Sequence, residues 1–95
     1  MLIIHADIFA KEGLGDEIAK IAQPLITATQ AEEGCISYNL FRDTTDDCLF
    51  RFVEYWESQE ALDRHVKSEH FQKYFPQLTE RTSKPAVIKS HKVAE

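Results

Sequence analysis

The chain has 95 residues, of which 43% are hydrophobic, and a formal net charge of −5 at pH 7. A chain of this length buries one core, so residues 1–95 are predicted to form a single domain. The acidic balance and the absence of a Lys and Arg run argue against nucleic acid or an anionic membrane as a partner. No apolar run approaches the roughly 20 residues that span a bilayer, and the uncharged start is too short for a signal peptide, which predicts a cytoplasmic protein.

The N-terminal third predicts a strand followed by a long helix. Residues 2–9 alternate in a period of two, with one clean apolar face. Gly13 and Gly15 close this strand. Apolar residues then recur at helical spacing, namely Leu14, Ile18, Ile21, Ala22, Leu25 and Ile26. Pro24 is expected to kink this helix, which should end by Gly34.

Two strands flank a polar turn in the middle of the chain. In residues 35–42 the alternation places Ile36, Tyr38 and Leu40 on one face. Residues 43–47 are predicted to form a turn, because they are rich in side chains that bond their own backbone. This acidic segment lacks the loop length and the terminal Glu of a calcium site. The two cysteines, Cys35 and Cys48, would lie about 20 Å apart at roughly 3.3 Å per residue, which predicts two reduced thiols.

The next strand carries polar groups on an apolar face. Phe50, Phe52, Glu54 and Trp56 alternate with the residues between them, so one carboxylate and one indole share a face with two phenylalanines. That face cannot be plain core. Glu54 could form a salt bridge to Arg42 or Arg64, and Trp56 could simply fill core space. The sequence leaves these alternatives open.

Two capped helical segments follow directly. Ser58 can cap a helix with an apolar stripe formed by Ala61, Leu62, His65 and Val66, so His65 is predicted to face inward. Ser68 can cap a further segment with a stripe formed by Phe71, Tyr74, Phe75 and Leu78. Pro76 is expected to divide this segment, because proline removes a helical hydrogen bond. Residues 87–93 are predicted to form a fourth strand.

This order of elements predicts an α+β fold of the ferredoxin-like βαββαβ type. Right-handed crossovers give a four-stranded antiparallel sheet with the helical regions on one face. The other face would carry Phe9, Phe41, Val53 and Tyr55 without a covering layer. Exposed apolar patches of this kind usually meet a partner, so we expect a homodimer in which two sheets face each other.

Four segments resemble the antibiotic biosynthesis monooxygenase superfamily of dimeric α+β barrels. They are residues 32–38 (EEGCISY), 41–43 (FRD), 54–65 (EYWESQEALDRH) and 68–71 (SEHF). The superfamily includes cofactor-independent quinol and anthrone monooxygenases, haem-degrading monooxygenases, and the isomerase that processes the phosphorylated autoinducer-2 signal. The resemblance therefore implies the fold more specifically than the reaction.

Single positions separate these activities. Trp56 matches an active-site Trp of the anthrone oxygenases, but Phe52 stands where they have an Asn. The haem degraders have a Trp at the position that corresponds to His65, and their axial His falls where this chain has Phe75. Their first-strand Asn aligns with Ala6. The isomerase resembles this chain at residues 32–34, Asp43, Glu54, His65 and His70, which many quinol-type members also share.

These residues favour a quinol monooxygenase that works without flavin or metal. His65 and Glu54 are the predicted catalytic residues for acid and base chemistry, and either of them could be the base. The predicted substrate contacts on a small aromatic ring are Tyr38, Trp56, His70 and Phe71. A buried structural role is the alternative for His65, and a helix-terminal role is the alternative for His70.

Two other functions stay open at this point. The first is an isomerase of the autoinducer-2 type, whose phosphorylated substrate would need basic residues beyond Arg64, Lys67 and Lys73. The second is a noncatalytic dimer that binds a hydrophobic compound in a stress response. Oxygen consumption would separate this binding protein from a monooxygenase.

Overall fold

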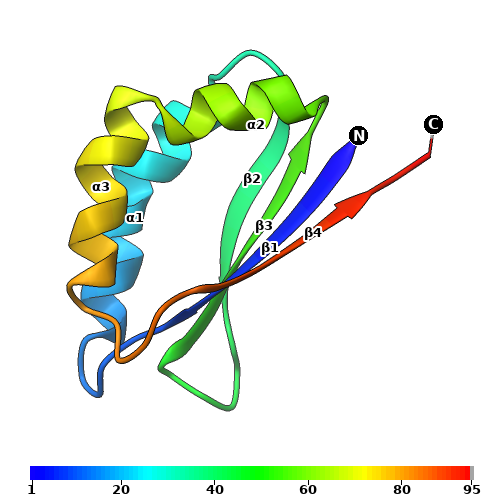
Figure 1. The fold of residues 1–95 in the computed structure, drawn as a ribbon. Helices are drawn as coiled ribbons and strands as arrows, with labels where there is room; N and C mark the ends of the chain where they lie inside the picture. Colours follow the sequence, from blue (N-terminus) through cyan, green and yellow to red (C-terminus); the bar gives the residue numbers. More distant parts are fainter. Residues whose placement is uncertain (95) are drawn as a thin grey trace.

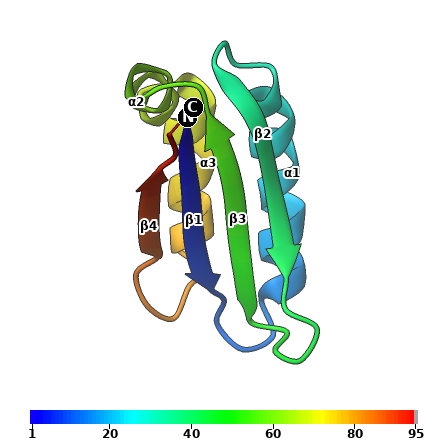
Figure 2. The ribbon, with the colours of Figure 1, turned by 90° about the vertical axis from the view of Figure 1, so that its right-hand side faces the viewer.

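A computed structural model describes residues 1–94 of the chain (Figure 1). Its elements are β1 (Leu2–Phe9), α1 (Gly15–Gln30), β2 (Cys35–Arg42), β3 (Leu49–Trp56), α2 (Gln59–Val66), α3 (Glu69–Thr79) and β4 (Val87–Lys92). The strands form one antiparallel sheet in the order β2-β3-β1-β4, and all three helices lie on the same face of it (Figure 2). The ferredoxin-like prediction is confirmed, with two helices, α2 and α3, in the second helical region.

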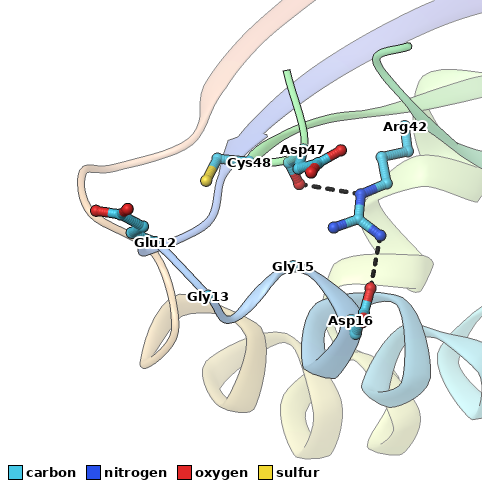
Figure 3. Close-up of a pocket in the computed structure, with 7 residues that line it drawn as sticks. All are labelled: Glu12, Gly13, Gly15, Asp16, Arg42, Asp47 and Cys48. Atoms are coloured by element: carbon cyan, nitrogen blue, oxygen red, sulfur yellow. Dashed lines mark hydrogen bonds and ion pairs between the residues drawn. The ribbon is translucent and has the colours of Figure 1, made fainter. Parts of the chain in front are cut away.

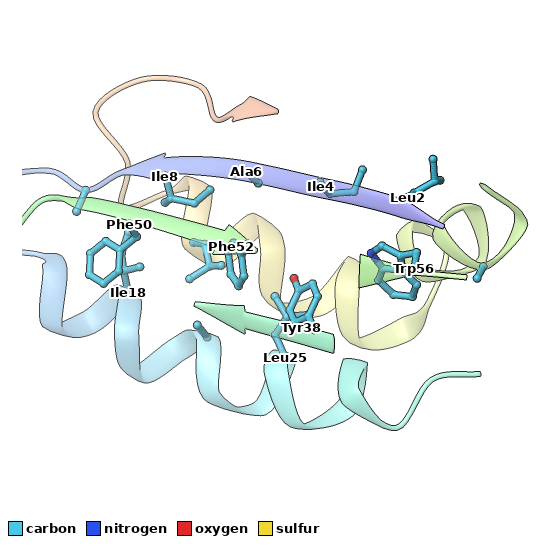
Figure 4. Packing of buried hydrophobic residues seen from close by; sticks show 14 residues of the cluster. Leu2, Ile4, Ala6, Ile8, Ile18, Leu25, Tyr38, Phe50, Phe52 and Trp56 are labelled. Carbon is cyan, nitrogen blue, oxygen red and sulfur yellow. The ribbon is translucent and has the colours of Figure 1, made fainter. Parts of the chain in front are cut away.

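The core lies between α1 and the two central strands. Side chains of β1 and β3 alternate between buried and more exposed positions, as their period-two sequence predicts. The register pairs Ile4 with Glu54 and Ala6 with Phe52, so the inward residues of both strands share one face. Figure 4 shows this face packing its apolar side chains toward Ile18 and Leu25 of α1.

The edge strand β2 departs from the predicted alternation at its first residues. A register shift between Cys35 and Ser37 inserts Ile36 as an extra residue opposite β3. Ile36 is 51% exposed, so the prediction that it shares the inward face of Tyr38 is wrong. Beyond the bulge the pairing is regular, and Tyr38 lies directly opposite Glu54.

Both predicted serine caps are present. The Ser58 side chain accepts a hydrogen bond from the Ala61 N–H, and Ser68 does the same for Phe71. The prediction that Pro76 divides the last helical segment is wrong, because α3 continues through it to Thr79. The missing N–H forfeits one bond, whereas Leu78, in the last turn, is fully buried and anchors that turn on the core.

The face of the sheet opposite the helices has no covering element within residues 1–94 (Figure 1). Phe41 and Tyr55 are the large exposed apolar residues of the predicted patch, while Phe9 and Val53 are half-buried. Cys35 and Cys48 are free, as predicted. Among these described residues, no helix combines the length and apolar character needed to cross a membrane.

Candidate active site

A cavity of about 400 Å³ lies between the helix-facing side of the sheet and the helices α2 and α3. Its apolar walls are formed by Ile4, Ala6, Phe52, Leu62, Val66, Phe71, Phe75 and Ile88. Its polar side chains are Tyr38, Glu54, Gln59, Asp63, His65 and Ser90. No Lys or Arg of residues 1–94 is in its lining. An apolar chamber with a few convergent polar groups is typical of a small-molecule site.

Glu54 is buried in this chamber, and no cation of residues 1–94 pairs with it. The cross-strand pair places its carboxyl beside Tyr38, and Trp56 Nε1 donates a hydrogen bond of 2.9 Å to Glu54 Oε1. Burial raises the pKa of Glu54 to about 7, although the Trp56 hydrogen bond opposes the shift. This carboxyl can therefore hold or release a proton near neutral pH.

The salt-bridge alternative for Glu54 is wrong for both candidate partners. Arg42 instead contacts Asp16, with a distance of 2.7 Å from Nη1 to Oδ1. Arg64 forms no ion pair with Glu54 in the described part of the chain. The hydrogen-bond partner of the Glu54 carboxyl is the neutral indole of Trp56. No fixed positive charge of the described residues therefore holds this carboxyl in its ionised form.

His65 lies on the inward stripe of α2, as predicted, and is 2% exposed. Its Nδ1 is 2.6 Å from Glu32 Oε2, and His70 Nε2 is 2.9 Å from the same oxygen. Burial lowers the pKa of His65, and the nearby Glu32 carboxylate opposes that shift. The imidazole is thus neutral in the resting site and able to accept a proton.

Aromatic rings surround the His65 imidazole. The ring centroid of Trp56 lies 4.8 Å from the imidazole centroid and that of Tyr38 lies 5.3 Å from it. The Phe71 ring is 4.9 Å away, centroid to centroid, in an edge-to-face arrangement. These contacts restrict rotation of the imidazole, which also lines the cavity.

The predicted substrate contacts divide into two groups in the structure. Tyr38 and Phe71 line the cavity. Trp56 does not, because it is fully buried behind the wall and its N–H is used by Glu54. His70 also lies outside the cavity, on a groove between α1 and α3, because its ring turns toward Glu32.

Glu32 is a site residue that sequence reasoning did not select. It lies in the segment after α1 and reaches His65 across 33 positions. Gly34 makes this approach possible: its φ is +86°, and an added Cβ would lie 2.5 Å from the Cβ of Ala61 in α2. The EEG segment of the family resemblance was the available signal, but the contact itself depends on tertiary packing.

Glu32, His65 and His70 are also the group, within residues 1–94, whose donor atoms could hold a metal ion. Tetrahedral zinc at roughly 2.0–2.1 Å from each ligand would keep the ligand atoms about 3.3 Å apart. The observed 2.6 and 2.9 Å separations are instead those of charge-assisted hydrogen bonds. We therefore describe the group as a hydrogen-bonded triad.

A second hollow, of about 470 Å³, lies at the N-terminus of α1 (Figure 3). Arg42 crosses it, donating to Asp16 Oδ1 and to the backbone oxygen of Asp47. Glu12 and Cys48 complete this cleft with two glycines. Its charged groups are exposed or neutralise each other, so it lacks the buried reactive groups of the first cavity.

The structure is thus that of a ferredoxin-like α+β protein with an apolar cavity between its sheet and the helices α2 and α3. The family model for antibiotic biosynthesis monooxygenase matches residues 1–77. The chain therefore belongs to the antibiotic biosynthesis monooxygenase family.

Individual relatives agree with this assignment. An uncharacterized protein of Synechocystis sp. is 33% identical over 94 residues, covering 99% of this chain but 64% of its own length. The Bacillus subtilis protein YcnE, which carries the provisional name of monooxygenase, is 28% identical over 95 residues and 100% of both chains. A crystal structure of an antibiotic biosynthesis monooxygenase superposes over 100% of both chains, with a TM-score of 0.93 and 28% identity.

Proposed function

We propose that this protein is a cofactor-independent monooxygenase that oxidises a quinol or a polycyclic phenol with O₂. The observation that carries the proposal is the apolar cavity in which the imidazole of His65, the carboxyl of Glu54 and the phenol of Tyr38 converge. Membership of the family and the provisional name of the Bacillus relative support the general reaction class.

The chemistry of the cavity supports a neutral, planar substrate. Its volume of about 400 Å³ and its phenylalanine walls suit a fused aromatic ring system. Asp63 and Glu54 line it, whereas no cation does among the described residues, so a phosphate group would meet repulsion without a partner. This disfavours the isomerase of a phosphorylated substrate.

The reaction begins when His65 Nε2 takes the proton of a substrate hydroxyl. The resulting electron-rich anion passes an electron to O₂, and recombination forms a carbon–oxygen bond at the ring. Protonated Glu54 then gives its proton to the departing oxygen as the O–O bond breaks. For a quinol the balance is quinol plus O₂ giving hydroxyquinone plus water, with the substrate supplying all the electrons.

Oxygen uptake on addition of menadiol tests this proposal, with autoxidation subtracted. We expect His65→Ala to lower the enzymatic rate by about 100-fold or more, since general base catalysis contributes roughly 10²–10⁴-fold. His91→Ala, a change of the same kind at an exposed residue of β4, should keep the wild-type rate. The product should be a hydroxyquinone without hydrogen peroxide.

Equal rates for wild type and His65→Ala would remove His65 from the mechanism. Stabilisation by a quinone in a thermal shift assay without oxygen uptake would support the noncatalytic binding protein instead. Turnover of a phosphorylated ketose, with no quinol oxidation, would support the isomerase.

The proposed assembly is a homodimer through the bare sheet face. Phe41 and Tyr55 are exposed there, and burying such side chains against a second copy would remove apolar surface from water. Light scattering at micromolar concentration should give twice the chain mass, and Phe41→Asp should shift the protein toward the monomer. A monomer mass for the wild type would refute this assembly.

A further inference from the structure

One carboxylate oxygen connects two histidines that lie on different sides of the cavity wall. Glu32 Oε2 contacts Nδ1 of His65 at 2.6 Å and Nε2 of His70 at 2.9 Å. We infer that Glu32 and His70 are positioning residues that fix His65 in the tautomer with its proton on Nδ1, so that Nε2 keeps its lone pair for the cavity. The catalytic consequence rests on the proposed function, but the tautomer does not.

The hydrogen bond to Glu32 determines which ring nitrogen carries the proton. An ionised carboxylate can only accept hydrogen bonds, so a nitrogen 2.6 Å from it must donate. A neutral imidazole has one donor and one acceptor nitrogen, and Nδ1 of His65 is therefore the donor. Nε2, on the edge of the ring away from Glu32, is the nitrogen left to act as a base.

His70 constrains the carboxylate from the other side. Its Nε2 must also donate, so Oε2 of Glu32 is held between two N–H groups and cannot rotate away from His65. His70 lines the groove between α1 and α3 and does not line the cavity. A substrate in the cavity would therefore meet His65 and neither of the residues that orient it.

Ser68 holds the two histidines at a fixed separation. Its hydroxyl donates to the His65 carbonyl oxygen at 2.6 Å and accepts from the Phe71 N–H at 3.2 Å. It thereby links the end of α2 to the start of α3, and the two imidazole centroids lie 6.2 Å apart. The triad is thus built into the junction of two helices.

Nitrogen-15 NMR of the histidine side chains in the full chain tests the inference without any substrate. Wild-type His65 should show a protonated Nδ1 and an unprotonated Nε2. His70→Gln, which keeps an N–H donor near the position of Nε2, should preserve these signals. Glu32→Gln and His70→Leu should each give a mixture of tautomers, whereas Glu33→Gln, a matched change at the exposed neighbour, should leave them unaltered.

Kinetics with menadiol provide the second measurement. We expect kcat to fall about 10- to 100-fold in His70→Leu, as for other groups that orient a functional histidine, with little change in KM. Glu32→Gln should lose more, up to about 10⁴-fold, because a wrong tautomer removes the base. His70→Gln should restore most of the rate lost in His70→Leu.

Two results would overturn the inference. One is a wild-type His65 tautomer in folded Glu32→Gln and His70→Leu. The other is a change of the wild-type His65 signals on addition of EDTA, because it would place a metal ion where we place hydrogen bonds. A protein that does not oxidise menadiol would contradict the proposed function while leaving the NMR result to decide the role of Glu32.

Discussion

The cavity under α2 and α3 and the cleft at the N-terminus of α1 have similar volumes but differ in how their charges are compensated. The cleft at the N-terminus of α1 pairs the exposed Arg42 with Asp16, and solvent reaches both groups. The cavity under α2 and α3 buries Glu54 with no Lys or Arg of the described residues in its lining, and it holds His65 in a network with Glu32. The difference shows that volume alone does not identify a site, whereas burial without charge compensation makes proton affinities adjustable.

The largest expected effect concerns the uncompensated carboxyl of the cavity. Because burial raises the pKa of Glu54 from 4.5 to about 7, the folded chain holds a proton that the unfolded chain has released between these pH values. Stability contributed by this proton is present below pH 4.5 and is lost as the pH rises through about 7. The shift corresponds to about 3 kcal/mol.

Urea unfolding of wild type and Glu54→Gln at pH 5 and pH 8 measures this term. The wild type should lose about 2.5 kcal/mol more than the variant on going to the higher pH, because the amide does not ionise. The difference between the two proteins isolates Glu54 from the opposing titration of His65. An identical pH dependence in both proteins would mean that Glu54 is not buried as described.

The next prediction compares the stability loss on substituting Gly13, beside the cleft, with that on substituting Gly34, which packs against α2. Gly34 and Gly13 both have positive φ, but an added Cβ at Gly34 would meet Ala61 whereas at Gly13 nothing lies within 4 Å. Gly13→Ala should cost about 1 kcal/mol from backbone strain alone. Gly34→Ala should cost about 2 kcal/mol or more, because α2 must also move.

Thermal and urea denaturation check this ranking, and the rate of menadiol oxidation extends it. Displacing α2 moves His65 away from Glu32, so Gly34→Ala should lose activity while Gly13→Ala keeps it. Equal stability losses in the two variants would show that the contact between Gly34 and Ala61 is not tight.

A smaller effect is expected from the indole behind the cavity wall. Trp56→Phe removes the N–H that Glu54 accepts and that holds its pKa down, so the pKa of Glu54 should rise further. The loss of stability should be about 1 kcal/mol from the hydrogen bond. If protonated Glu54 is the proton donor, kcat falls as the pH rises through its pKa, so this fall should occur at higher pH in Trp56→Phe. An unchanged pH profile would remove Glu54 as the proton donor.

The smallest effect is expected in the compensated cleft. Asp16→Asn breaks the ion pair with Arg42, but both groups face solvent and are screened by salt. The denaturation midpoint in physiological salt and the rate of quinol oxidation should both stay at their wild-type values. A loss as large as that of Gly34→Ala would show that the two regions are not as different as their burial indicates.

Most of the fold was predictable because the relevant signals are local. The period-two alternation of β3 determines which of its sides is buried, and Ser58 and Ser68 supply the caps of α2 and α3. Pro76 shows where a local rule fails, since the burial of Leu78 outweighs one missing hydrogen bond.

The candidate site was predictable only in part. His65, Glu54, Tyr38 and Phe71 reach the cavity because each faces inward on its own element. The bulge at Ile36 left no mark in the alternating sequence, and Glu32 joins the site through a contact between distant segments. Such contacts depend on how elements pack, which periodicity does not report.

The exposed edge strand β4 forms part of the cavity wall. It pairs with β1 alone, all six of its residues are exposed, and yet Ile88 and Ser90 line the cavity. Substitutions at Ile88 and Ser90 can reshape this part of the cavity wall without disturbing the buried core. One short exposed strand thus sets part of the shape of the cavity independently of the packing of the interior.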